Sequence, residues 1–434
     1  MINFLLQVWK TEKEKDIFDM ENVNKKKLFR FTTIGSVDNG KSTLIGRLLH
    51  DSKAIYADQY EQLKNNQNSW QTEEINLAYL TDGLKREREE GITIDVAYRY
   101  FSTPRRKFVI VDSPGHIEYT RNMITGSSNA NAALILIDAQ KGLDEQTKRH
   151  TIISSLLKIG HIVVCINKMD KVKYQKGVFE KIRKEYEEFT SKLNFSDVRF
   201  VPISALKGDN VVIKSGNMPW YQGPTLMYLL ESMYFSSDRD LVNCRFPIQS
   251  VREKEGRKYI SGTIAGGVFK NGDKIMVLPL MKITMIKNIF LYNKNIQEAF
   301  PPMSITMELA DALNVRRGMI IARPNNIPVG SKILDAMLCW FDDRGILLKN
   351  KKYILFSGSK KVFCKVKEIF YKININTLHR DFEYDIIQAN DIARVKLMIE
   401  DIIFYDSFYI NKNTGSFILI NPETNNTVAA VMIR

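Results

Sequence analysis

Residues 35–43 of this 434-residue chain read Gly35, Ser36, Val37, Asp38, Asn39, Gly40, Lys41, Ser42 and Thr43. The pattern Gly-x4-Gly-Lys-Ser stands between an apolar run typical of a strand and an amphipathic run typical of a helix. Its glycines let the backbone fold around a phosphate, so that several N–H groups and the positive end of the helix point at it. Lys41 is then predicted to reach the β- and γ-phosphates of a nucleotide, and the Ser42 hydroxyl to bind Mg²⁺. The stretch predicts a phosphate-binding loop near the start of an α/β domain.

A second phosphate loop is predicted where the apolar run 107–111 ends. It consists of Asp112, Ser113, Pro114 and Gly115. An acidic residue at this position holds Mg²⁺ through water, and the Gly115 N–H can touch a γ-phosphate because no Cβ stands in the way. By itself Asp-x-x-Gly is a common turn, and only its place after the first loop favours the phosphate role. His116 follows directly and is predicted to orient the attacking water, the role that Gln has in small GTPases.

Two further loops follow core strands and predict a pocket for guanine. They are Asn167, Lys168, Met169 and Asp170 after the run 162–166, and Ser204, Ala205 and Leu206 after the run 199–203. The Asp170 carboxylate can accept the N1–H and the 2-amino group of guanine, a donor pair that adenine lacks. The Lys168 stem can lie over the base, Asn167 can tie the loops together, and the second loop can offer a backbone N–H to O6. GTP, rather than ATP, is the expected nucleotide.

A switch segment is predicted between the first helix of this domain and its next strand. It comprises Gly91, Ile92, Thr93, Ile94 and Asp95. The Thr93 hydroxyl can bind Mg²⁺ and its N–H the γ-phosphate, and both contacts are lost after hydrolysis. The charged run 85–90 before it has a plainer interpretation as the solvated end of a helix.

The pattern of hydrophobic residues divides the chain into an α/β part and a β part. Apolar strands are expected at 29–34, 107–111, 132–137, 162–166 and 199–203, an antiparallel edge strand at 96–101, and helices at 146–158 and 179–193. Such near-continuous apolar strands between helices predict a mostly parallel sheet covered on both faces. Later strands are expected at 246–251, 259–264, 274–278 and 304–309. We predict an N-terminal extension (1–28), a P-loop GTPase domain (29–240) and two small β-barrels (243–328 and 329–434).

The composition excludes several other classes of protein. No stretch approaches the roughly 18 apolar residues of a membrane span, and the start of the chain lacks the features of a signal peptide, so a cytoplasmic protein with no membrane partner is expected. The four cysteines are widely spaced, which favours thiols over zinc ligands or disulfides. The net charge of +14 comes from lysines spread over the whole chain, which favours a bias of the whole composition over a binding stripe. The charge alone does not identify a partner, and nucleic acid is not the expected one.

Seven segments carry a resemblance to a known family: residues 35–49, 82–102, 121–126, 146–150, 208–210, 218–221 and 223–225. Through them the chain, from residue 29 to its end, resembles the translation-factor class of GTPases. Within that class the chain is most similar to sulfate adenylyltransferase subunit 1, the GTPase-subunit family of bacterial ATP sulfurylase. This similarity rests on the sequence of residues 82–102 and on Ser36, where elongation factors usually have His. It departs from that family at Asn39, Ser113 and Met319, where an acid, Thr and Asp are usual.

The resemblance implies a partner and a reaction. The partner is a smaller catalytic subunit that binds ATP and sulfate and forms a heterodimer with this chain. Its nucleotidyltransferase reaction, the first step of sulfate assimilation, gives adenosine 5′-phosphosulfate and pyrophosphate, and GTP hydrolysis drives it. The rival expectation, from the shared architecture and the positive charge, is an elongation-factor-type GTPase that carries aminoacyl-tRNA.

Overall fold

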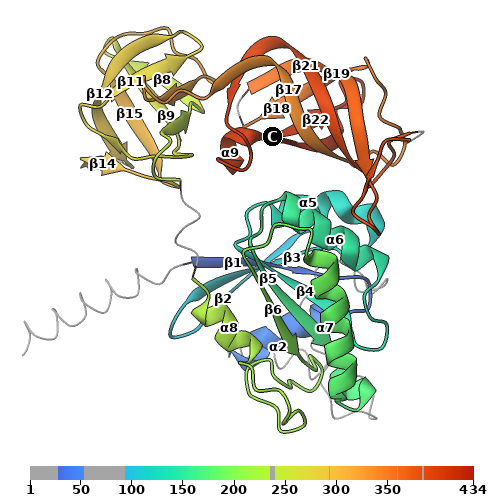
Figure 1. The fold of residues 1–434 in the computed structure, drawn as a ribbon. Helices are drawn as coiled ribbons and strands as arrows, with labels where there is room; N and C mark the ends of the chain where they lie inside the picture. Colours follow the sequence, from blue (N-terminus) through green and yellow to red (C-terminus); the bar gives the residue numbers. More distant parts are fainter. Residues whose placement is uncertain (1–27, 53–92, 235–239, 293, 359, 384–385) are drawn as a thin grey trace, which may run out of the picture. The chain divides into compact units, whose positions relative to one another are not determined.

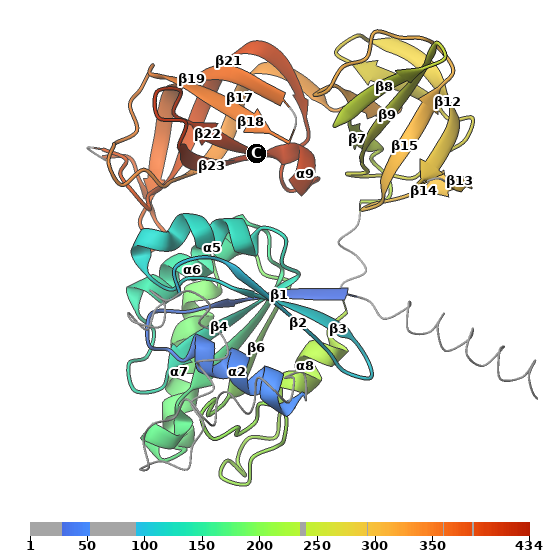
Figure 2. The ribbon, with the colours of Figure 1, turned by 180° about the vertical axis from the view of Figure 1, so that it is seen from behind.

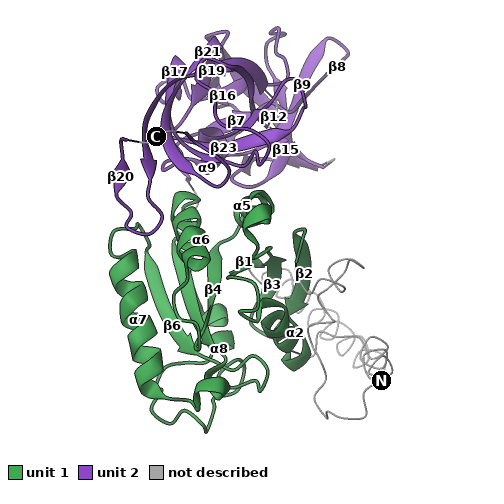
Figure 3. Cartoon of the chain, turned by 90° about the vertical axis from the view of Figure 1, so that its right-hand side faces the viewer, with its two compact units in different colours: residues 1–234 green, residues 235–434 purple. Residues whose placement is uncertain are grey.

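The computed structural model describes residues 28–52, 93–234, 240–292, 294–358, 360–383 and 386–434. The chain forms two compact units, residues 1–234 and residues 235–434 (Figure 3). The predicted N-terminal extension, up to residue 27, lies outside the described residues, and so do the predicted switch residues Gly91 and Ile92. The division into domains at residues 240–243 and 328–329 stays a prediction.

The first unit is built on one six-stranded sheet of order β2-β3-β1-β4-β5-β6. Its strands are β1 (Leu28–Ile34), β2 (Ala97–Ser102), β3 (Lys107–Asp112), β4 (Ala132–Asp138), β5 (His161–Asn167) and β6 (Asp197–Pro202). All neighbours pair in parallel except β2, which runs antiparallel to β3 at the edge. Every residue of β4 is buried, as expected for a central strand with both faces covered. The predicted α/β sheet with an antiparallel edge strand is confirmed.

Helices cover both faces of this sheet. They are α2 (Lys41–Asp51), α5 (Thr120–Ser127), α6 (Glu145–Leu156), α7 (Lys176–Thr190) and α8 (Leu226–Ser232). Helices α2 and α8 lie on one face, and α5, α6 and α7 lie on the other (Figures 1 and 2). Helix α6 ends earlier than its apolar pattern predicts because Lys158 adopts a left-handed backbone with φ of +55°.

The register of the parallel strands brings the predicted site loops to one edge of the sheet. Thr33 pairs with Asp112, Ile34 with Ile135, and Asp138 with Asn167, so the carboxyl ends of β1, β3, β4 and β5 lie at the same edge of the sheet, where β4 and β5 extend beyond β1. In open α/β sheets ligands bind outside these carboxyl ends. The two phosphate loops and the Asn167 loop therefore leave the sheet side by side.

The second unit begins with a half-open β-barrel of order β7-β16-β11-β12-β15-β9-β8, with β13 beside β12. Its long strands are β8 (Ser250–Lys254), β9 (Arg257–Thr263), β11 (Lys274–Leu278), β12 (Lys282–Leu291) and β15 (Ser304–Leu309). Its short strands are β7 (Arg245–Pro247), β13 (Lys294–Ile296) and β16 (Ile320–Ala322). The predicted strand 246–251 is two strands: the Ile248 N–H bonds to Met319 and the Gln249 N–H to Ser261, so the chain changes neighbours between them.

The rest of the second unit is a closed six-stranded barrel. Its order is β18-β22-β23-β17-β21-β19, and pairing of β18 with β19 completes the ring. The strands are β17 (Val329–Trp340), β18 (Lys352–Ser357), β19 (Lys360–Ile373), β21 (Ile392–Tyr405), β22 (Ser416–Ile420) and β23 (Thr427–Ile433). Leu334, Trp340, Leu355, Leu397 and Val431 fill its interior. The predicted pair of β-barrels after the α/β unit is confirmed.

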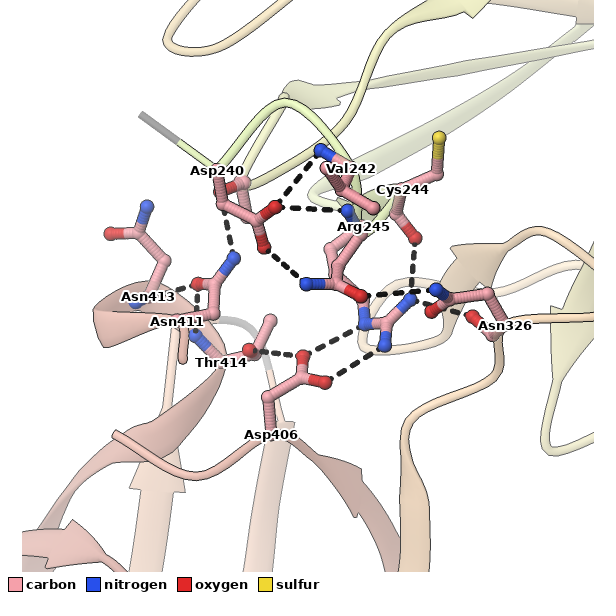
Figure 4. Close-up of polar contacts among 11 residues, drawn as sticks. Asp240, Val242, Cys244, Arg245, Asn326, Asp406, Asn411, Asn413 and Thr414 are labelled. Atoms are coloured by element: carbon pink, nitrogen blue, oxygen red, sulfur yellow. Dashed lines mark hydrogen bonds and ion pairs between the residues drawn. The ribbon is translucent and has the colours of Figure 1, made fainter. Parts of the chain in front are cut away.

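A buried ion pair joins the two barrels within the second unit (Figure 4). The Nε and Nη2 groups of Arg245, at the start of β7, donate to the two carboxylate oxygens of Asp406 at 2.8 Å each. The Thr414 hydroxyl donates to the same carboxylate at 2.7 Å. Arg245 Nη1 donates to the carbonyls of Cys244 and Asn326. Both charges are buried, and each is hydrogen-bonded to its partner and to further protein groups, which is the condition under which such a pair is stable.

Replacing Asp406 with Ala is therefore expected to lower the free energy of unfolding by about 3–5 kcal/mol, because Arg245 keeps a buried charge without its counter-ion. Urea denaturation of the full chain measures this loss. Asp343→Ala, at an exposed position in the same barrel, is the matched control and should change little. Equal denaturation midpoints for the two variants would show that the ion pair does not hold the barrels together.

Candidate nucleotide-binding site

The first phosphate loop joins β1 to α2 and depends on Gly40. Its backbone turns through left-handed conformations at Asp38, with φ of +66°, and at Gly40, with φ of +88°. A Cβ added at Gly40 would lie 2.4 Å from Asn167 Nδ2, so only glycine fits beside the loop that follows β5. Ser42 and Thr43 form the first turn of α2, whose N–H groups are available to an anion.

Lys41 is buried in the centre of this loop. Its Nζ donates to the carbonyls of Gly35, at 2.8 Å, and Ser36, at 3.0 Å. Burial lowers the pKa of Lys41 to about 8, although the charges of Asp112 and Asp38 oppose that shift. An ammonium group has three donors, so one remains for a phosphate oxygen once the two carbonyls are satisfied.

The second phosphate loop packs directly on the first. A Cβ added at Gly115 would lie 2.3 Å from Lys41 Nζ and 2.4 Å from the Gly35 carbonyl oxygen, so this position too requires glycine. Asp112, at the end of β3, is 2 % exposed and accepts a hydrogen bond from the Thr33 hydroxyl at 3.3 Å. The structure thus brings the predicted phosphate ligands into one cluster.

Ser113 and Pro114 are buried beside this cluster. The Ser113 hydroxyl lies 2.9 Å from that of Thr32, which in turn lies 3.1 Å from that of Ser127 on α5. These contacts fix the start of the second loop against the central strand.

His116 lies on the surface immediately after Gly115. Its side chain is 40 % exposed, and its Nδ1 accepts a hydrogen bond from the Glu118 N–H at 3.4 Å. That bond caps the short 3₁₀ helix η2 (Ile117–Tyr119). The ring is therefore held at Nδ1 and remains partly exposed to solvent.

Asn167 holds together the two loops that are predicted to bind the base, residues 167–170 after β5 and residues 204–206 after β6. Its Nδ2 donates to the Asn39 carbonyl at 2.8 Å, and its Oδ1 accepts from the Ala205 N–H at 2.9 Å. Asn167 thereby links the first phosphate loop, the loop after β5 and the loop after β6. Asp170 accepts a hydrogen bond from the Ser204 hydroxyl at 2.7 Å, which orients one of its two carboxylate oxygens.

Lys168 has a partner that sequence reasoning missed. Its Nζ lies 2.8 Å from the Asp138 carboxylate, a group that is 2 % exposed at the end of β4. Lys168 adopts a left-handed backbone with φ of +62°, while Met169 is buried beneath the loop. Asp138 stands in no motif, but its place at the carboxyl end of a fully apolar strand is a signal that could have identified it.

The described part of the switch segment, residues 93–95, is attached to α5. Asn122 Nδ2 on that helix donates to the Ile94 carbonyl at 2.9 Å. The Asp95 carboxylate accepts from the Val96 N–H at 2.7 Å. Thr93 is half-buried just before this attachment. Sequence reasoning also missed Asn122, although it lies in one of the segments that carry the family resemblance.

In the part of the chain that the structure describes, no group of three or more His, Cys, Asp or Glu side chains could hold a metal ion by itself. Among the same residues, no helix is long and apolar enough to cross a membrane.

Comparisons with known proteins assign the chain to a family. Residues 26–289 match the family model for the elongation factor Tu GTP-binding domain, and residues 333–434 match that for the GTP-eEF1A C-terminal domain. Sulfate adenylyltransferase subunit 1 of Aliarcobacter butzleri is 46% identical over 98% of this chain and 90% of its own length. That of Bacteroides fragilis is 44% identical over 95% of this chain and 87% of its own. The bifunctional enzyme CysN/CysC of Mycobacterium tuberculosis is 46% identical over 94% of this chain and 67% of its own.

A solved structure of sup35 complexed with GMPPNP is a more distant match. It has a TM-score of 0.43 and 21% identity, and the match covers 94% of each chain.

Proposed function

The chain belongs to the sulfate adenylyltransferase subunit 1 family of elongation-factor-class GTPases, and from that premise we propose how its nucleotide site serves the activation of sulfate. It is the GTPase subunit of sulfate adenylyltransferase, an enzyme of sulfate assimilation. The observation that supports the proposal best is the convergence on Asn167, which bonds to both the first phosphate loop and the Ser204–Ala205 loop.

GTP binds with its phosphates on the first loop and its base between the two loops after β5 and β6. Lys41 and the N–H groups at the start of α2 hold the β- and γ-phosphates. The free oxygen of Asp170 accepts from the guanine ring, while the Lys168 stem covers one face of the base. Gly35, Ser36, Val37, Asp38 and Asn39 supply the backbone that surrounds the phosphates.

Mg²⁺ fits the side chains at this site. Ser42, Thr93 and Asp112 are the residues that would hold it, and all three offer oxygen, the donor that Mg²⁺ prefers. A bound Mg²⁺ supplies charge that neutralises the phosphate oxygens. Within this site Thr93 releases the γ-phosphate after hydrolysis, and the segment that follows it, attached to α5 through Ile94, transmits the change.

Hydrolysis requires a water molecule aligned with the γ-phosphorus. His116 orients that water from its position next to Gly115, with Nδ1 held by the Glu118 N–H and the side chain partly exposed. The cost of synthesising a phosphoric–sulfuric anhydride explains why GTP hydrolysis is coupled to the reaction.

The partner is a smaller, catalytic subunit that binds ATP and sulfate in the cytoplasm and forms a heterodimer with this chain. The one Gly-x4-Gly-Lys-Ser loop of this sequence holds GTP, and the proposal places the ATP site in the partner. Adenylyl transfer from ATP to sulfate then gives adenosine 5′-phosphosulfate and pyrophosphate.

The test is formation of pyrophosphate by the purified pair of subunits. We expect release of pyrophosphate that requires sulfate, ATP and GTP together and stops when GTP is replaced by a non-hydrolysable analogue. A pair that gives no sulfate-dependent pyrophosphate would contradict the proposal. The rival function, delivery of aminoacyl-tRNA, rests on the +14 charge and the shared architecture, and GTP-dependent tRNA binding at low salt would support it instead.

A further inference from the structure

Arg47 on α2 connects that helix to the base loop, which is the loop of residues 204–206 after β6. It has no role in the proposed binding or hydrolysis of GTP. Its Nε donates to the Ala205 carbonyl at 3.1 Å, and its Nη2 donates to the Leu206 carbonyl. Its Nη1 lies 3.7 Å from the Asp51 carboxylate one turn further along the helix. The side chain is 20 % exposed, so these contacts form a largely buried clamp between two segments 158 and 159 residues apart.

The hydrogen bonds of the base loop leave one donor for a ligand. The Ala205 N–H donates to Asn167 Oδ1, the Lys207 N–H to the Ser204 hydroxyl, and the Gly208 N–H to the Ser204 carbonyl. Among the bonds of the described residues, the Leu206 N–H has no protein acceptor. It is therefore the loop amide that can reach guanine O6.

The Arg47 clamp fixes the direction of that amide. The Ala205 carbonyl and the Leu206 N–H belong to one peptide unit, and this bond is not one of the two cis peptides in the described chain. In a planar trans peptide the C=O and N–H point in opposite directions. Because the carbonyl is held by Arg47, the Leu206 N–H points away from that side chain and is available to a ligand.

Gly208 lets the loop pass close to the same side chain. It has φ of +84°, and a Cβ added there would lie 3.6 Å from Arg47 Cδ. The left-handed turn returns the chain along the Arg47 stem after the two clamped carbonyls. The Asp51 carboxylate, 3.7 Å from Nη1, also restrains the guanidinium.

We propose that Arg47 is a positioning residue for guanine recognition, which holds the Ala205 and Leu206 carbonyls so that the Leu206 N–H donates to O6 of the base. This inference rests on the proposed function, since it assumes GTP or GDP in the pocket. The polar partners of Arg47 in the described chain are Ala205, Leu206 and Asp51, and none of them belongs to the phosphate loops. Arg47 acts through the loop, so its loss should weaken recognition of O6 more than recognition of the rest of the base.

The test compares GDP with 6-thio-GDP by calorimetric titration of the full chain. Sulfur replaces O6 in the second ligand and is a weaker acceptor, while the N1–H and the 2-amino group that face Asp170 are unchanged. We expect wild type to prefer GDP, and Arg47→Ala to lose about tenfold in GDP affinity, the value of one hydrogen bond. Its affinity for 6-thio-GDP should fall less, so that the preference is lost.

Arg47→Lys should restore part of the preference, because an ammonium group can still bond one of the two carbonyls. It also carries the test if Arg47→Ala does not fold. Arg183→Ala, which removes a half-exposed arginine from α7, is the matched control and should behave as wild type.

Three results would overturn the proposal or its premise. An Arg47→Ala protein with an unchanged ratio of GDP to 6-thio-GDP affinity would show that Arg47 only supports the fold. Wild type that binds both ligands equally would show that no loop amide reads O6. Wild type that binds no GDP would instead contradict the proposed function itself.

Discussion

Replacing Asp170 with Asn is expected to lower the affinity for GDP about a thousandfold and to raise the affinity for XDP, because the site then offers a donor where guanine needs an acceptor. The oxygen of the new amide could still accept the N1–H, but its NH₂ group would face the 2-amino group of guanine. Xanthine carries an oxygen at that position and would accept the new bond. Ser204, whose hydroxyl donates to Asp170 at 2.7 Å, can keep the new side chain in place.

Competition binding with GDP and XDP measures this change of preference. Asp197→Asn on β6, which alters a surface ion pair with Arg199 in the same unit, is the matched control and should leave both affinities unchanged. An Asp170→Asn protein that binds GDP as tightly as wild type would show that Asp170 does not read the base.

The second large effect is expected at His116. His116→Ala should slow GTP hydrolysis by about three orders of magnitude while GTP affinity stays within a few-fold of wild type. The described bonds of this side chain go to Glu118 in its own turn and not to the loops that hold the phosphates, so its removal leaves those loops in place. His116→Gln should retain part of the rate, because an amide can also orient water.

Single-turnover hydrolysis of bound GTP separates this step from nucleotide exchange. The control is His379→Ala, an exposed histidine in the second barrel. Hydrolysis at the wild-type rate by His116→Ala would show that another group positions the water.

Much of the fold could be predicted because most strands of the first unit appear in the sequence as runs of apolar residues. The runs that became β4 and β5 are continuously apolar, and those that became β1 and β3 are rich in apolar and β-branched residues. Each ends in a motif or a conspicuous polar residue, so the parallel register places those residues at one edge of the sheet. Strand β12 was missed because Ile283 and Met285 are exposed on one face while Ile286 and Ile289 are buried on the other, which hides the alternation.

The contacts that support the motifs could not be predicted in the same way. Arg47 with the Ala205 carbonyl, Asp138 with Lys168, and Asn122 with the Ile94 carbonyl join segments far apart in the chain. Two of them use backbone carbonyls, which every residue has, so no pattern of side chains marks the acceptor.

The structure also accounts for two departures from the family pattern. Asn39 Nδ2 donates to the Leu136 carbonyl at 2.9 Å, a bond that an ionised acid could not make, and so attaches the phosphate loop to β4. Met319 is partly buried against the core of the first barrel, where its thioether packs as an apolar group.

The central claim is that GTP turnover on this chain is coupled to sulfate activation in a partner. The most direct measurement is the rate of GTP hydrolysis by the chain alone and with the ATP-binding subunit, with and without ATP and sulfate. The account predicts slow hydrolysis alone, stimulation only when partner, ATP and sulfate are all present, and adenosine 5′-phosphosulfate formed in proportion to GTP consumed. Hydrolysis that proceeds at one rate regardless of partner, ATP and sulfate would contradict it.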